Sequence, residues 1–314
     1  MRLNVAYACG EDYAKYAGVS IISLFENNKD FAEIYVYLID NGMTKNTKNI
    51  LCDIAEKYQR NIVFVKNSDI FDQHKFNHVG KYLSIIFSKM YLHKIIGINK
   101  IIYIDCDMII KKSLSKIWEK DMKDYLIAGV RMPTPIQYKK WFSSGNDNKY
   151  INSGFILFNL YNWRILDVES KINAFMHKHS EKVYIEENVI CNICEEKILV
   201  LEPEYNLNGL MIAFNSSQIK KLTKDESYYT QKQLENAKKN PIIIHFSSEI
   251  YQRPWYENCN HPLKKEYLYF LSISPWENQL EKGTTTFSVK IKNLLRTILP
   301  FQIYLGIRNL YKNI

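Results

Sequence analysis

Residues 102–110 read Ile-Tyr-Ile-Asp-Cys-Asp-Met-Ile-Ile, an apolar run that contains two acids. Asp105 and Asp107 stand one residue apart, and residues i and i+2 of a β-strand point to the same side of a sheet. Ligands of open α/β proteins bind where strands leave the sheet. Both carboxylates are therefore expected to face one pocket.

Two carboxylates in one pocket repel each other unless a cation or a hydrogen-bond donor lies between them. Hard divalent cations take oxygen ligands and often join one or two carboxylates to substrate phosphates. The pair therefore favours a metal–nucleotide site. The alternative is that Asp107 caps the following turn and Asp105 is merely exposed, and the rest of the chain must decide between them.

Strand-like and helix-like segments alternate through the chain. Strands are expected at residues 4–9, 33–38, 61–65, 100–104, 125–130, 155–159 and 242–245. Helices are expected at residues 14–25, 45–58, 82–96, 113–118, 168–179 and 185–193. This alternation predicts an α/β fold with a mainly parallel sheet and flanking helices.

Composition narrows the class of protein. The 314 residues include 42 Lys and Arg against 33 Asp and Glu, a net charge of +9. Anionic substrates and an anionic membrane surface match this charge; nucleic acid is not expected, because no signature of a nucleic-acid-binding domain accompanies it. The sequence lacks an apolar run that would span a membrane, and its first residues are too short for a signal peptide. Six scattered cysteines, with an isolated Cys191–Cys194 CxxC pair, favour a reduced, cytosolic protein.

Two segments interrupt the alternation. Residues 131–150 combine prolines, a Ser-Ser-Gly-Asn cluster and large aromatics, a composition that predicts a long functional loop or lid. Residues 279–314 begin like a linker, and from residue 287 they interleave bases with apolar residues and contain no acid. We expect a main domain at 1–278 and a small, basic, amphipathic helical extension at 279–314 that binds an anionic membrane or a partner. The alternative is a helix packed on the main domain.

Further polar patches border apolar segments. Asn152, Ser153 and Gly154 suit sugar hydroxyls at the start of a strand, although a simple turn is the alternative. Glu186 and Glu187 stand at the start of a helix, where acids can also serve only as dipole partners.

His245 ends a buried strand and could complete an oxygen–nitrogen metal shell. A lone histidine of this kind is more often a core residue, and the D-x-D pair is what favours the ligand role. Arg253, in an Arg-Pro-Trp sequence downstream, would then contact a diphosphate.

Taken in order, these patches resemble the retaining glycosyltransferases of family 8 over about residues 3–276. The resemblance rests on five collinear segments: the opening strand and helix at 5–24, Phe-Ser-Lys-Met-Tyr-Leu around Lys89, the D-x-D, Asn-Ser-Gly followed by Asn-Leu-x-x-Trp-Arg, and His-Phe-Ser-Ser to Arg-Pro-Trp at 245–255.

The resemblance implies a GT-A fold, a UDP-sugar donor and Mn²⁺, with Mg²⁺ as a possible substitute. The implied metal ligands are Asp105, Asp107 and His245. The implied donor-binding residues are Ala8, Cys9, Asp12, Tyr13, Lys89, Asp105, Cys106, Ser153, Ser248 and Arg253. The implied residues around the reacting hexose are Asn152, Glu186 and Glu187.

The implied function is metal-dependent transfer of galactose or glucose from a UDP-hexose to a surface glycan or glycoprotein. The enzyme would work in the cytoplasm at the inner face of the cell membrane. Glu187 would act as a nucleophile in a double displacement, or the acceptor would attack from the front face within an ion pair. The alternative to an enzyme is a catalytically degenerate nucleotide-sugar-binding protein, which the unusual Gly10 and Ser248 would fit.

Overall fold

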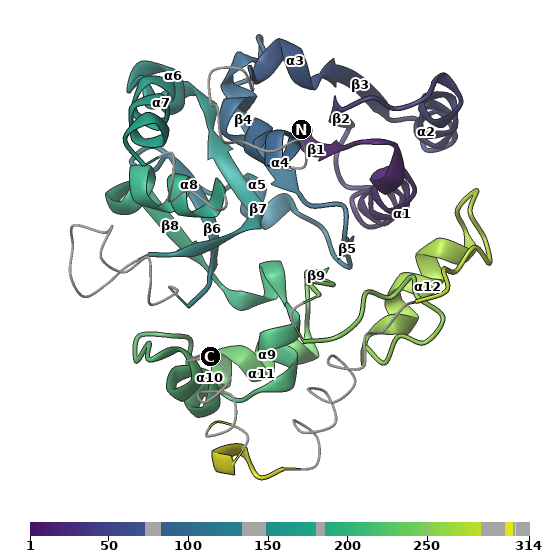
Figure 1. Cartoon of the computed structure of the whole chain (residues 1–314). Helices are drawn as coiled ribbons and strands as arrows, with labels where there is room; N and C mark the ends of the chain where they lie inside the picture. The colour runs from purple at the N-terminus through teal and green to yellow at the C-terminus, as the bar shows by residue number, and fades with distance from the viewer. Residues whose placement is uncertain are drawn as a thin grey trace.

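The computed structural model describes residues 1–72, 83–133, 149–179, 186–248, 250–283, 299–303 and 305. Its centre is a seven-stranded sheet with the strand order β3-β2-β1-β4-β7-β6-β8 (Figure 1). The strands of this sheet are β1 (Arg2–Cys9), β2 (Glu33–Asp40), β3 (Asn61–Lys66), β4 (Lys100–Ile104), β6 (Ile127–Arg131), β7 (Ile151–Asn159) and β8 (Ile198–Leu201).

Most neighbouring strands of the sheet run parallel. β3, β2, β1 and β4 pair in parallel, as do β6 and β8. β7 is antiparallel to both of its neighbours, β4 and β6. The predicted α/β class with a mainly parallel sheet is therefore confirmed, and the reversed β7 brings its amino end beside the carboxyl end of β4.

Helices surround the sheet. The α-helices are α1 (Glu11–Asn27), α2 (Lys45–Lys57), α3 (Asn67–Ile70), α4 (Leu83–Phe87), α5 (Ser115–Trp118), α6 (Leu160–Ile165), α7 (Val168–Lys178), α8 (Glu186–Cys194), α9 (Gly209–Ala213), α10 (Ser216–Thr223), α11 (Gln231–Lys239) and α12 (Lys264–Ser272). The 3₁₀ helices are η2 (Ser88–Lys94), η4 (Glu195–Lys197) and η5 (Pro203–Asn206).

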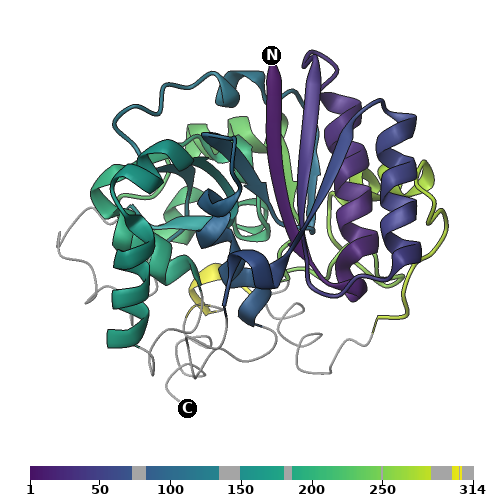
Figure 2. The same ribbon diagram turned by 90° about the horizontal axis from the view of Figure 1, so that it is seen from above.

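Alternation along the strands divides the core between the two faces of the sheet. In β4, Ile102 and Ile104 belong to one apolar cluster, whereas Ile101 and Tyr103 belong to the other. The first cluster includes residues of α1, α2 and α9 to α12, and the second includes residues of η2 and α6 to α8. Both faces are thus covered, and α1 and α2 lie next to each other on one of them (Figure 2).

One predicted helix is wrong. Residues 82–96 were expected to form a continuous helix, but α4 ends at Phe87 and a 3₁₀ helix follows. The Ser88 hydroxyl donates to the Ile85 carbonyl over 2.6 Å, a local bond that competes with the regular helical pattern. The other expected strands and helices are confirmed to within a few residues, apart from β7, which begins four residues earlier than the expected strand at 155.

The last of the predicted strands, expected at residues 242–245, lies outside the main sheet. β9 (Ile243–His245) pairs antiparallel with β5 (Met108–Ile110) in a separate two-stranded sheet. β5, β8, α3, α6 and α9 to α12 were not predicted, although capping boxes mark the starts of α10 and α11: Asn215 with Gln218, and Thr230 with Gln233.

The expected lid at 131–150 lies mostly outside the described residues, and so does most of the extension at 279–314. Where the extension is described, Phe301 packs edge-on against Phe214 with ring centroids 6.1 Å apart. Earlier in the extension, Glu281 accepts a hydrogen bond from Lys15 over 3.1 Å. None of the helices in the described part of the chain is long and apolar enough to cross a membrane.

Candidate active site

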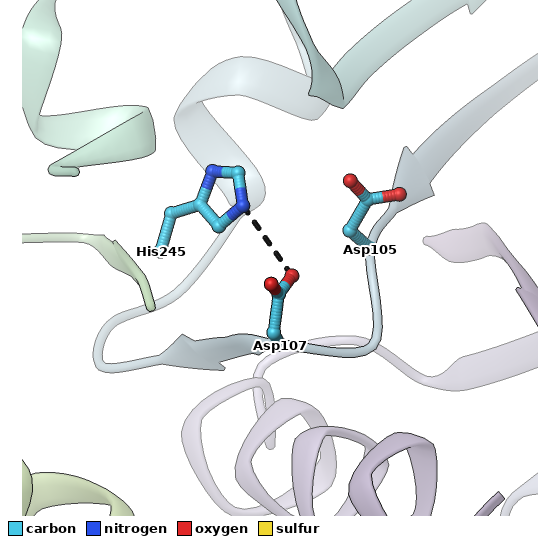
Figure 3. A group of neighbouring side chains, drawn as sticks. All are labelled: Asp105, Asp107 and His245. Atoms are coloured by element: carbon cyan, nitrogen blue, oxygen red, sulfur yellow. Dashed lines mark ion pairs between the residues drawn. The ribbon is translucent and has the colours of Figure 1, made fainter. Parts of the chain in front are cut away.

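The two acids of the D-x-D lie in the turn between β4 and β5 rather than within a strand. β4 ends at Ile104, so the strand alternation that predicted a shared pocket does not apply to Asp107. The two acids nevertheless lie close together, because one ligand atom each of Asp105, Asp107 and His245 lie within 4.8 Å of one another. Figure 3 shows the two carboxylates directed to the same side, with the His245 ring beside them.

The pairing of β5 with β9 places His245 at this site. Met108, which follows Asp107, is the register partner of His245, and Phe246 N–H donates to the Asp107 carbonyl over 2.9 Å. His245 Nε2 lies 3.3 Å from Asp107 Oδ1. The small second sheet therefore brings together residues that are 138 positions apart in the sequence (245 minus 107).

Gly154 lies directly against Asp105 and His245. It lies inside β7, so the alternative of a turn before the strand is wrong. A Cβ at this position would lie 2.8 Å from Asp105 Oδ2 and 2.9 Å from His245 Cε1. Real Cβ atoms do not come so close to their neighbours, and only glycine leaves room for the two side chains.

A buried ion pair lies on the other side of Asp105. Lys89 Nζ is 2.8 Å from Glu186 Oε1 and 3.5 Å from Asp105 Oδ1, and the Lys89 side chain is 0% exposed. Burial alone would lower the pKa of Lys89, but the two carboxylates outweigh it and raise the pKa, so the ammonium stays charged. Ser153 Oγ donates to the same Glu186 oxygen over 2.7 Å.

A second cation approaches Asp107. Arg253 Nη2 lies 3.3 Å from Asp107 Oδ2, and Arg253 Nη1 donates to the Tyr13 hydroxyl over 2.8 Å. Burial raises the pKa of Asp107, yet His245 and Arg253 outweigh this effect and lower it to about 2. Asp107 is therefore a carboxylate at any pH at which the protein would work.

Glu187 faces the site from the start of α8. Its Oε2 accepts from the Ser153 backbone N–H over 2.9 Å and from Asn152 Nδ2 over 3.3 Å. α8 and β7 together thus place three of the predicted sugar-side residues, Asn152, Glu186 and Glu187, next to one another.

Sequence reasoning missed Asn206. This residue ends η5 and is fully buried. Its Oδ1 lies 3.0 Å from His245 Nδ1, and its Nδ2 donates to Asn152 Oδ1 over 2.8 Å. The only signal in the sequence is a pair of asparagines, at 206 and 208, in a segment with no regular pattern.

Carboxylate side chains outnumber the Lys and Arg side chains at the site: Asp105, Asp107, Glu186 and Glu187 lie beside Lys89 and Arg253. This excess of acids, with the close group of Asp105, Asp107 and His245, fits a divalent cation. Two carboxylates and one imidazole form a mixed oxygen–nitrogen donor set, and imidazole is a common ligand of transition metals.

The other residues predicted to bind the sugar donor fall into two groups. The Cys106 thiol, which is buried, donates to the Ala8 carbonyl over 3.7 Å, and its hydrogen bond with Cys9 and its burial raise its pKa. These three residues thus line the ends of β1 and β4. Asp12 and Ser248 are exposed, and no hydrogen bond within the described residues joins either of them to the site.

Comparison with known proteins agrees with this geometry. The model of glycosyl transferase family 8 matches residues 4–259. General stress protein A of Bacillus subtilis (strain 168) is 26% identical over 279 residues, which is 87% of this chain and 94% of that protein. A lipopolysaccharide 1,2-glucosyltransferase of Escherichia coli (strain K12) is 24% identical over 304 residues, or 93% of this chain and 85% of that protein.

Solved structures show the same fold. The crystal structure of the galactosyltransferase LgtC, in complex with donor and acceptor sugar analogues, aligns with a TM-score of 0.70 at 16% identity. It covers 92% of this chain and 99% of that one. GlyE of Streptococcus pneumoniae TIGR4 aligns with a TM-score of 0.61 over 99% of this chain and 64% of that one, at 15% identity. The expected GT-A fold is confirmed, and the chain belongs to glycosyl transferase family 8, the family of retaining glycosyltransferases that its sequence resembles.

Proposed function

We propose that this glycosyltransferase moves galactose or glucose from a UDP-hexose to a surface glycan or glycoprotein, with retention of configuration and with a divalent metal. The observation that carries the proposal is the meeting of Asp105, Asp107 and His245 with the buried pair Glu186 and Glu187 in one site. Relatives with hexosyltransferase names support it, and because they include both a glucosyltransferase and a galactosyltransferase, the hexose stays open.

In this proposal, each side chain has a defined task. Asp105, Asp107 and His245 hold the metal, with Mn²⁺ preferred over Mg²⁺ because of the imidazole. A bound divalent cation neutralises the diphosphate and acts as a Lewis acid. Arg253 adds a charge-assisted contact to the diphosphate, and Lys89 contributes a fixed positive charge beside the donor.

The nucleotide part of the donor is assigned to the ends of β1 and β4. Ala8, Cys9 and Cys106 line this region, and Tyr13, a residue that is 39% exposed, supplies an aromatic ring whose hydroxyl accepts from Arg253. Asp12 and Ser248 stand further out, and contacts from them to the donor remain part of the proposal.

The hexose is assigned to the space beside Asn152, Ser153, Glu186 and Glu187. Glu187 is a nucleophile if a double displacement operates and a stabiliser of positive charge if the acceptor attacks the front face. Glu187→Gln separates the two routes, because the glutamine carbonyl can still accept from Ser153 N–H and Asn152 Nδ2. A trapped glycosyl adduct on Glu187, detected by mass spectrometry, supports the nucleophile; a fully active Glu187→Gln variant contradicts it.

The proposed function is tested by release of UDP from a panel of UDP-sugars, with Mn²⁺ or with EDTA. We expect release from one hexose, abolished by EDTA and by Asp107→Asn. Asp124→Asn, at an exposed aspartate away from the site, is the matched control and should behave like the wild type. Tight binding of UDP-sugar with no release, even with candidate acceptor glycans, would instead support a degenerate binding protein.

We also propose that the extension at 279–314 attaches the enzyme to an anionic membrane from the cytoplasmic side. Its five bases without an acid, between residues 287 and 314, support this role. Phe301, within this segment, also packs against Phe214. Flotation with phosphatidylglycerol vesicles, lost on truncation after residue 278 but with UDP release retained, is the expected result; equal flotation of the truncated chain contradicts the role.

A further inference from the structure

The orientation of the Asn152 amide is determined by two backbone groups. Ser153 N–H donates to Glu187 Oε2 over 2.9 Å, so this oxygen is an acceptor and Asn152 presents its NH₂ group to it. Gly154 N–H donates to Asn152 Oδ1 over 3.2 Å, which requires the same orientation. Neither backbone donor can reverse its role, so the Asn152 carbonyl oxygen must point away from Glu187.

The orientation of the Asn206 amide follows from that of Asn152. The Asn152 carbonyl oxygen needs a donor, and Asn206 Nδ2 supplies it at 2.8 Å. Asn206 must then direct its own carbonyl oxygen to His245 Nδ1, 3.0 Å away. Because that oxygen only accepts, Nδ1 of His245 carries a hydrogen. Nε2 then faces the acids, 3.3 Å from Asp107 Oδ1, and is the atom available to a metal.

The backbone keeps Asn206 beside His245. Leu207 N–H donates to the Ile243 carbonyl over 3.0 Å, and His245 N–H donates to the Leu207 carbonyl over 2.9 Å. The segment after η5 therefore runs along β9, and its position is independent of the two side-chain bonds.

We propose that Asn206 is a positioning residue that joins the two sides of the site. It fixes the Nδ1–H tautomer of His245, which presents Nε2 as a metal ligand, and it holds Asn152 with its NH₂ on Glu187. One amide thus orients the His245 ring directly and the Glu187 carboxylate through Asn152. The proposal rests on the assignment of His245 as a metal ligand and of Glu187 as a sugar-side group.

The first readout is the tautomer of His245 in the metal-free protein. Long-range ¹H–¹⁵N spectra of protein labelled with ¹⁵N-histidine, recorded at alkaline pH, distinguish Nδ1–H from Nε2–H. His245→Asn identifies the signal among the seven histidines. We expect Nδ1 to carry a hydrogen in the wild type. In Asn206→Ala we expect Nδ1 to lose part of its hydrogen to Nε2, which still faces Asp107.

The second readout separates the two arms of Asn206. Asn206→Ala removes both bonds, and we expect Mn²⁺ affinity, measured with UDP present from the electron paramagnetic resonance of free Mn²⁺, to fall about 10- to 100-fold. Asn206→Asp keeps an acceptor for His245 but has no NH₂ for Asn152. This variant should keep the tautomer and the Mn²⁺ affinity, while turnover of the donor falls about tenfold or more because a buried acceptor loses its partner.

Asn208→Asp is the matched control. Asn208 is as buried as Asn206 and lies two residues further on, but its Oδ1 caps α9 by accepting from Met211 N–H over 3.2 Å. We expect wild-type tautomer, affinity and turnover in this variant.

Two results would overturn the proposal. One is an unchanged tautomer and Mn²⁺ affinity in Asn206→Ala. The other is an equal loss in Asn206→Asp and Asn208→Asp, which would indicate general loosening of the segment. Failure of the wild type to release UDP from any sugar would count against the proposed function but would leave the tautomer and Mn²⁺ measurements intact as a test of Asn206.

Discussion

The two cationic side chains of the site differ in their access to solvent. The Lys89 side chain is 0% exposed and pairs with Glu186, which is 6% exposed. The Arg253 side chain is 26% exposed. It contacts both Asp107 and the hydroxyl of Tyr13, a residue that is 39% exposed. The Lys89 half of the site is therefore a fixed part of the core. In the Arg253 half, Asp107 and His245 are also buried, but the Arg253 side chain is partly exposed and can exchange partners.

This difference has a physical basis. A buried charge that loses its partner cannot be rescued by water, so the Lys89 pair must keep one geometry. A partly exposed guanidinium gives up less when it leaves a carboxylate, because water replaces the contact. We therefore expect substitutions at Lys89 to have large effects on stability and substitutions at Arg253 to have moderate effects on ligand binding.

The largest effect is expected from Lys89→Met, which leaves Glu186 and Asp105 without their buried cation. The free energy of unfolding should fall by about 3–5 kcal/mol, as measured by urea denaturation. Lys94→Met, at a lysine that is 33% exposed and paired with Glu169, is the control and should cost less than about 1 kcal/mol. Similar losses in the two variants would remove the distinction between the halves.

pH should act on the segment that carries Arg253. The ring of His261, a residue only 3% exposed, packs against Phe246 and Tyr251, and its Nδ1 accepts from Leu263 N–H over 3.1 Å. Burial lowers the pKa of His261 from 6.5 to about 4. As the pH falls from 6.5 to 4, His261 is therefore protonated in the unfolded chain but stays neutral in the folded chain. This difference favours the unfolded state, and the free energy of unfolding falls by up to about 3 kcal/mol over this range.

His261→Asn tests this pH effect. The asparagine oxygen can accept from Leu263 N–H, but the side chain does not titrate. The free energy of unfolding of this variant should depend less steeply on pH between 6.5 and 4 than that of the wild type. Parallel curves would show that other groups cause the acid sensitivity.

Gly154→Ala should weaken the metal site. The added methyl group would have to displace Asp105 or His245, and overpacking of this kind costs about 1–3 kcal/mol. We expect a corresponding loss of Mn²⁺ affinity, measured by calorimetry with UDP present. Gly97→Ala, at a turn with open space around it but a positive φ of 87°, should lower stability slightly without changing Mn²⁺ affinity.

The smallest effects are expected at Arg253. Arg253→Ala should weaken UDP binding about tenfold, because one charge-assisted contact is lost. It should lower the free energy of unfolding less than Lys89→Met does, because Arg253 is partly exposed and Asp107 keeps His245 as a partner. Arg253→Lys keeps the charge without the planar fork and should lie between the wild type and the alanine variant. A large loss of stability in either variant would show that the Arg253 half is as rigid as the Lys89 half.

Local sequence patterns predicted much of the site. The acids at 105 and 107, the Asn-Ser-Gly at 152–154 and the acids at 186 and 187 lie next to recognisable strands or helices, and the structure brings them together. Asn206 escaped because its role depends on two partners distant in the sequence, His245 and Asn152. Residues 82–96 were misjudged because apolar spacing alone does not reveal a local bond such as that of Ser88 to Ile85.

The sequence by itself determined the α/β class, the mainly parallel sheet and the identity of the metal-ligand candidates, because strand and helix periodicity and short motifs are local properties. Only the tertiary structure decided that β9 leaves the main sheet to pair with β5, and that Lys89 is buried while Arg253 is not. These features depend on contacts between segments far apart in the chain. The direction of the hydrogen bonds through Asn206 was also decided only by the tertiary structure. Backbone N–H donors of β7 determine it, and no sequence pattern predicts that these donors lie near Asn206.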